Sequence, residues 1–94
     1  MRLDLFLKLS RLVPKRTLAK EFTMAGLIDV NGRQAKSSYE VKPGDEILIK
    51  RRSSRTLVRV TDVPLKKQVS KKSARKLYEL LAQEKIDPLT GQID

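Results

Sequence analysis

The sequence predicts an α+β domain in which two helices pack on a small, mostly antiparallel sheet, followed by a C-terminal helix. Three observations support this fold class. Two segments near the start repeat apolar residues at helical spacing, with Pro14 between them. Short runs of alternating apolar and polar residues follow, the first two joined by Asn31-Gly32. A last apolar repeat begins after Ser70, a residue type that commonly caps helices.

The first helix is expected over residues 3–12 and is apolar on most of its circumference. Asp4, Lys8 and Arg11 form one narrow polar stripe at spacings of four and three residues. A helix of this kind is buried on most sides, so it should be the central helix of the domain. Two roles stay open for Lys8: a surface ion pair with Asp4, or contact with RNA.

The second helix is expected over residues 15–25. Leu18, Phe22 and Ala25 fall on one face and should point into the core, and Gly26 is the expected C-terminal cap. Since Gly26 ends this helix and Pro14 precedes it, the two helices form a helix-turn-helix-like pair.

Cations are concentrated where the second helix begins. Lys15 and Arg16 lie in its first turn, where the helix dipole disfavours positive charge. Arg16 and Lys20 point away from the predicted core face. Basic residues beside free backbone N–H groups favour the binding of an anion such as phosphate. The alternative is a solvated basic face.

Four strands are expected after the helix pair. The first two form a hairpin, because Asn-Gly readily adopts the positive φ angles of a tight turn. Alternating apolar residues predict the third and fourth strands, and Pro64 ends the last one. The expected strand ranges are 27–30, 33–35, 46–50 and 56–63, with a loop at 36–40 and a turn at 41–45.

The 94 residues suggest one domain with one modest core. Residues 1–64 should form its body. A basic segment and a helix at 71–84 should pack on that body within residues 65–85. Residues 86–94 contain Pro88 and Gly91 and show no periodicity, so they are expected to be a flexible tail.

Composition excludes several classes of function. A net charge of +10 on 94 residues favours a polyanionic partner, with nucleic acid first. The chain has no Cys and no His, so thiolate metal sites, disulfides and the commonest general base are excluded. No cofactor or metal is expected. The apolar start is too short and too often interrupted by charge for a signal peptide, and we expect a cytoplasmic protein.

Four motifs in order resemble the S4-type RNA-binding domain over residues 2–50. They are Arg2-Leu3-Asp4, the stretch from Arg16 to Lys20, the stretch from Ala25 to Gly32, and the stretch from Val41 to Ile47. Each motif alone is common, whereas the ordered set is specific. The resemblance implies an S4-like (αL motif) helix pair on a small sheet, within a domain at residues 1–64.

The whole chain also resembles the RqcP and heat-shock protein 15 family of ribosome-associated quality-control factors. Its length, the Met-Arg-Leu-Asp start and the Lys-Leu-Tyr-Glu-Leu-Leu segment carry this likeness. The resemblance implies a factor that binds the large ribosomal subunit carrying stalled peptidyl-tRNA, with contacts to rRNA and to the tRNA. It also implies support for C-terminal alanine tailing of the stalled chain, alongside an RqcH-type partner.

The family resemblance gives Arg2 and Arg16 the role of RNA-contacting arginines. Lys8, Arg11, Lys15 and Lys20 are assigned to the same surface of the helix pair. A second basic group forms a possible second RNA face: Arg51, Arg52, Arg55, Lys66, Lys67, Lys71 and Lys72. Phosphate contacts do not read sequence, so we expect recognition of RNA shape. Tyr39 falls in a polar loop and is the one aromatic residue available for base stacking, but an ordinary amphipathic loop tyrosine is the favoured interpretation.

Other function classes fit less well. Asp45-Glu46 is the only acidic pair and falls in a predicted turn, so it does not indicate an enzyme. A DNA-binding helix-turn-helix protein would need Asn, Gln or Arg facing base edges, and the second helix has neither Asn nor Gln. No long basic amphipathic helix indicates membrane binding. A ribosome-assembly or structural rRNA-binding protein remains the alternative, and a monomer is expected.

Overall fold

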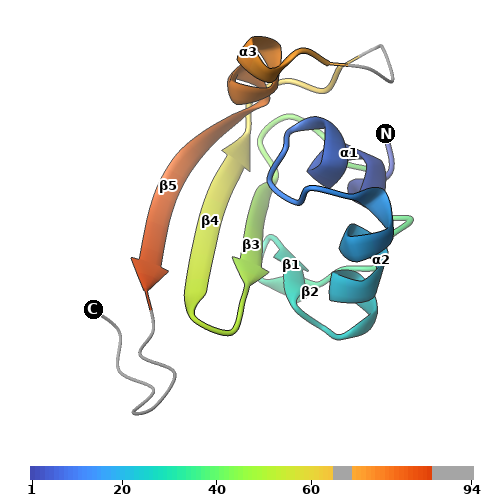
Figure 1. The fold of residues 1–94 in the computed structure, drawn as a ribbon, viewed down its shortest axis with the longest axis vertical. Coiled ribbons are helices and arrows are strands. Elements are labelled where there is room, and N and C mark those ends of the chain that lie inside the picture. The colour runs from blue at the N-terminus through green and yellow to red at the C-terminus, as the bar shows by residue number, and fades with distance from the viewer. Residues whose placement is uncertain (65–68, 86–94) are drawn as a thin grey trace.

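Two helices cover one side of a five-stranded antiparallel sheet in the computed structural model, which describes residues 1–64 and 69–85 (Figure 1). The helices are α1 (Leu3–Leu9) and α2 (Arg16–Met24), and strands β1 (Ile28–Val30), β2 (Arg33–Gln34), β3 (Glu46–Lys50) and β4 (Ser54–Val60) follow. The described chain ends with α3 (Lys71–Ala74), the 3₁₀ turn η1 (Arg75–Leu77) and β5 (Tyr78–Lys85). The strand order is β2-β1-β3-β4-β5, and the predicted α+β fold class is confirmed.

The core lies between α1, α2 and the sheet. Leu3, Phe6 and Leu7 of α1 have no exposed surface, as expected for a central helix. They face the inward residues of the central strands, among them Ile47 and Val58. Burying an apolar side chain of this size is worth about 1.5–3 kcal/mol, so this layer fixes where α1 lies.

Both helices are shorter than predicted. The helix expected at 3–12 ends at Leu9, because Ser10 caps it and Arg11 takes a left-handed φ of 62°. The helix expected at 15–25 runs from Arg16 to Met24. Gly26 follows it with φ 75°, which confirms the predicted glycine cap.

The predicted core face of α2 is partly wrong. Leu18 and Phe22 pack against the core, but Ala25 is exposed and the fully buried positions are Ala19 and Thr23. Thr23 satisfies its hydroxyl by donating to the Lys20 carbonyl at 2.8 Å. The helix therefore turns a small-residue face toward its neighbours, which permits close packing.

The turn at Asn31-Gly32 forms as predicted, with φ angles of 53° and 81°. Asn31 also reaches the turn before β3: its Nδ2 donates to Asp45 Oδ1 at 3.1 Å, and its Oδ1 accepts from the Glu46 amide at 3.0 Å. Asp45 is buried and also accepts from the Tyr39 hydroxyl and the Lys42 amide. This carboxylate joins three loop segments.

The helix predicted at 71–84 is wrong beyond its first turn. Ser70 does cap α3 by accepting from the Ser73 amide at 3.2 Å, but the chain leaves the helix at Arg75 and becomes β5. β5 pairs along all of β4, and Leu77 enters the core just before it. Local helix propensity loses here because pairing with the open edge of β4 satisfies a full strand of backbone groups.

One strand boundary also differs from the prediction. The strand expected at 56–63 runs from Ser54 to Val60, so only residues 51–53 connect β3 to β4. β5 belongs to the same sheet as β1–β4, so residues 69–85 extend the sheet that the first 64 residues begin. The expected flexible tail at 86–94 lies outside the described residues.

Candidate nucleic-acid interface

Arg2 and Arg16 meet at one buried carboxylate. Asp4 has no exposed surface; Arg2 donates to both of its oxygens, the Leu5 amide donates to Oδ1, and Arg16 lies beside Oδ2. Arg2 Nε lies 3.3 Å from Oδ1, and Arg16 Nε lies 3.4 Å from Oδ2. The arginine side chains are 46% and 40% exposed. A buried anion thus holds two cations at the surface, and we call Arg2 and Arg16 the arginine pair.

The backbone brings the arginine pair together from two elements. Arg2 precedes α1 in extended conformation and forms an antiparallel bridge with Glu40. The Leu3 amide donates to the Tyr39 carbonyl at 2.8 Å, so the start of α1 is fixed to the loop before β3. Arg16 is the first residue of α2 and reaches the first turn of α1 because the helices pack side by side.

The structure excludes the surface ion pair that the helical spacing suggested between Asp4 and Lys8. Asp4 points inward to the arginine pair, whereas Lys8 is exposed. Periodicity placed Asp4 on a polar stripe and did not reveal its burial. An Asp two residues after Arg2, in a first helical turn where an anion is favoured, was the available signal.

The other cations predicted on the helix pair are all exposed: Lys8, Arg11, Lys15 and Lys20. Lys15 is the N-cap residue of α2, and its side chain makes no capping hydrogen bond to the described chain. The first amides of α2 point along the dipole toward this basic end, so the arrangement suits an anion.

The second basic group does not form one face. Arg51, Arg52 and Arg55 lie where β3 turns into β4, whereas Lys71 and Lys72 lie on α3 at the opposite end of these strands (Figure 1). Lys71 and Lys72 line an open hollow of about 290 Å³ together with Arg75. Lys66 and Lys67 lie outside the described residues.

Base stacking has little support from the aromatic residues. Tyr39 packs against the core, and its hydroxyl donates to Asp45 at 3.0 Å, which agrees with a structural loop tyrosine and not with the stacking alternative. Burial and this hydrogen bond raise the pKa of the Tyr39 hydroxyl. Phe6 is buried, and Phe22 and Tyr78 are packed partly against the core. With base stacking set aside, phosphate contacts and recognition of RNA shape are the remaining modes of binding for this surface.

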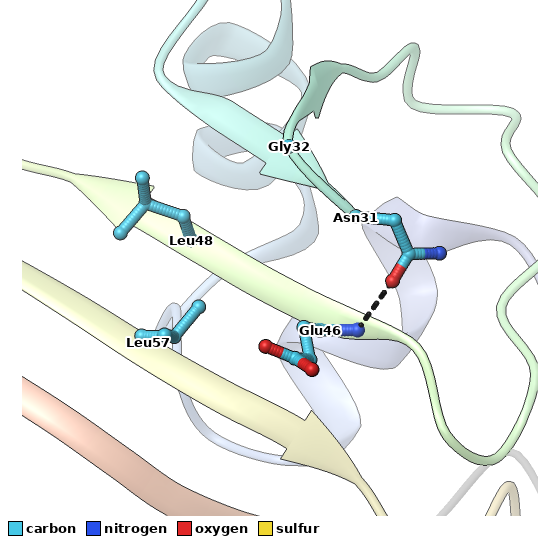
Figure 2. Close-up of a pocket in the computed structure, with 5 residues that line it drawn as sticks. All are labelled: Asn31, Gly32, Glu46, Leu48 and Leu57. Carbon is cyan, nitrogen blue, oxygen red and sulfur yellow. Dashed lines mark hydrogen bonds between the residues drawn. The ribbon is translucent and has the colours of Figure 1, made fainter.

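The sheet face away from the helices has a different character. Figure 2 shows Leu48 and Leu57 side by side on β3 and β4, beside an open hollow of about 460 Å³ at the Asn31-Gly32 turn. Charges here are neutralised in pairs, with Arg59 contacting Glu46 at 3.7 Å and Lys50 contacting Asp29 at 3.2 Å. Within residues 1–64 and 69–85, the exposed cations of the helix pair other than the arginine pair have no ion-pair partner, so they suit a polyanion better than this face does.

Comparison with known proteins places this geometry in a family. An S4 domain model matches residues 1–47, which contain Asp4 and both members of the arginine pair. A Bacillus subtilis strain 168 protein named RQC P-site tRNA stabilizing factor is 49% identical over 86 residues, covering 92% of this chain and 98% of that protein. The chain belongs to the RQC P-site tRNA stabilizing factor family.

Other members and a solved structure agree with this assignment. The factor of the same name from Halalkalibacterium halodurans is 48% identical over 86 residues, covering 92% of this chain and 96% of its own. The trimeric structure of Vibrio cholerae heat shock protein 15 matches with a TM-score of 0.79 and 26% identity, over 87% of this chain and 82% of that one. The resemblance seen in the sequence is confirmed.

No helix in residues 1–64 and 69–85 has the length and apolar character needed to span a membrane.

Proposed function

We propose that this stabilizing-factor family member binds the large ribosomal subunit while the subunit carries stalled peptidyl-tRNA. In this proposal it contacts rRNA and the tRNA, and it supports ribosome-associated quality control with C-terminal alanine tailing beside an RqcH-type partner. It acts as a monomeric binding protein in the cytoplasm and not as an enzyme. Two observations support this proposal: the name that its relatives carry, RQC P-site tRNA stabilizing factor, and the arginine pair on Asp4.

The buried Asp4 carries the mechanistic part of the argument. A carboxylate on one side of each guanidinium fixes its orientation and reduces the conformational entropy lost on binding. Because these side chains are 46% and 40% exposed, guanidinium donors that Asp4 does not use are available to an anion, and an arginine fork bonds a phosphate with two hydrogen bonds. Two such forks from two helix ends match the backbone of a structured RNA, which proteins recognise by shape.

The acidic pair supports the non-enzymatic part of the proposal. Asp45 is buried with three hydrogen-bond donors on its oxygens, which leaves it a structural role. Glu46 contacts Arg59 on the outer sheet face. The two carboxylates therefore point to different environments and do not form a shared acid–base site.

Arg16→Ala is expected to weaken binding to purified large subunits that carry peptidyl-tRNA by about 5- to 150-fold. This range corresponds to about 1–3 kcal/mol, typical of losing a charge-assisted hydrogen bond. Equilibrium binding of labelled protein measures it, with circular dichroism to confirm folding.

Lys85→Ala is the matched control, because it removes one exposed cation from β5, the edge strand that lies on the side of the sheet away from the helix pair (Figure 1). It should bind like the wild-type protein apart from a small loss of general attraction. Equal affinities for wild type and folded Arg16→Ala would remove Arg16 from the interface.

A further inference from the structure

The junction between α1 and α2 contains an arginine in an unfavourable conformation. Arg11 has φ 62°, its amide donates to the Lys8 carbonyl at 3.0 Å, and the Val13 amide closes the turn on Leu7 at 3.1 Å. Glycine is the usual residue at such a helix end, because a side chain strains a left-handed backbone. Fold stability alone therefore does not explain an exposed arginine at this position.

A second arginine reaches the same junction from the sheet. Arg51 lies in the turn from β3 to β4, where its amide donates to the Ser54 carbonyl at 2.8 Å. Its Nη2 donates to the Leu12 carbonyl, which is 39 residues away in the sequence. This bond places a cation near the C-terminal end of α1, where the dipole favours it. It uses one of five guanidinium donors, and the side chain remains exposed.

Arg52 follows Arg51 in the turn and is also exposed. The contact between Arg51 and Leu12 thus brings together the two chain segments that carry Arg11, Arg51 and Arg52, and we call these three residues the junction cluster. The sequence carries neither Asp nor Glu from residue 5 to 20 or from 47 to 61, so no acidic residue of these segments neutralises it. The cluster continues along the chain into Lys15 and Arg16.

We propose that the junction cluster is a second phosphate-binding site for the same structured RNA that the arginine pair binds. This inference rests on the proposed function and extends its interface from the helix pair onto the turn between β3 and β4. It explains both the strained Arg11 and the position of Arg51. Lys71 and Lys72 lie at the other end of the sheet and are not part of this site.

The test compares two double variants with the same loss of charge. Arg11→Gly with Arg52→Ala removes two cations of the cluster and leaves Arg51 on Leu12. Arg75→Ala with Lys76→Ala removes two exposed cations from η1, which lies next to α3 at the other end of the sheet (Figure 1). The affinity of each protein for purified large subunits carrying peptidyl-tRNA is measured over a range of salt concentrations.

The logarithm of affinity should fall less steeply with the logarithm of salt in the first variant. Two lost phosphate contacts lower the slope by about 1.4 to 1.8, and the control should keep the wild-type slope. Arg11→Gly should also raise the melting temperature, which excludes unfolding as the cause.

A wild-type slope in the Arg11→Gly/Arg52→Ala protein would overturn the proposal. If Arg16→Ala still weakens binding in that case, only the junction cluster is excluded. If Arg16→Ala also binds like the wild type, Arg16 is removed from the interface as well; if the wild-type protein itself does not bind these subunits, the proposed function fails together with this inference.

Discussion

Asp4→Asn is expected to weaken binding to large subunits that carry peptidyl-tRNA, although it makes the protein more positive. The amide keeps the shape of the side chain but loses the charge that orients Arg2 and Arg16. We expect a loss of about 1–2 kcal/mol, or roughly 5- to 30-fold in affinity, because both forks lose their fixed orientation. Equilibrium binding at constant salt measures this change.

Asp29→Asn gives a control with the same change in net charge. Asp29 pairs with Lys50 on the sheet and contacts neither arginine of the pair. General electrostatics predicts tighter RNA binding for both variants. If Asp4→Asn binds as tightly as Asp29→Asn, then orientation by Asp4 has no part in recognition.

Asp45→Ala is expected to lower the free energy of unfolding by about 2–4 kcal/mol, a large loss for a domain of this size. The substitution removes the acceptor for Asn31 Nδ2 at 3.1 Å, the Tyr39 hydroxyl at 3.0 Å and the Lys42 amide at 2.9 Å. Unsatisfied buried donors account for this magnitude. Thermal unfolding should show a melting temperature lower by about 10–25 °C for a domain of this size.

Glu46→Ala tests whether the effect belongs to Asp45. Glu46 is the adjacent carboxylate, but it makes only a surface ion pair with Arg59 at 3.7 Å, and such pairs contribute little. Its melting temperature should stay close to the wild type. A similar small shift for Asp45→Ala would show that the loop network around Asp45 does not stabilise the fold.

Asp45→Ala also changes the pH at which the Tyr39 hydroxyl ionises. Burial and the bond to Asp45 raise the pKa of Tyr39, so its neutral hydroxyl is favoured in the folded state. The stabilisation from this bond is present below the ordinary tyrosine pKa and is lost as pH rises through the raised one. Ultraviolet titration should therefore show Tyr39 ionising at lower pH in Asp45→Ala.

Local signals in the sequence predicted much of the fold. The Asn31-Gly32 turn, the Gly26 cap and the apolar circumference of α1 depend on neighbours within a few residues, and each was confirmed. β5 was missed because its state depends on pairing with β4, which follows from the fold and not from its own Leu-rich sequence.

In the candidate site, too, local signals were predictable and contacts that depend on the fold were not. Charge and helical spacing indicated Arg16 as an exposed cation, and the family resemblance indicated Arg2. The burial of Asp4 between them was not predictable, because it depends on how the start of α2 packs on α1. The contact of Arg51 with Leu12 joins residues 39 positions apart. It ties Arg51 to the helix pair and so separates this arginine from Lys71 and Lys72, which the sequence had placed in the same basic group.

In the proposed function, this protein acts on large subunits that still hold peptidyl-tRNA. Sedimentation of the protein from cells under translational stress, with identification of the RNA that co-purifies, tests the claim most directly. We expect the protein to travel with large subunits and with tRNA, on a small fraction of all particles. Sedimentation with small subunits, or equally with all particles, would contradict the proposed function and favour a role in ribosome assembly or structure.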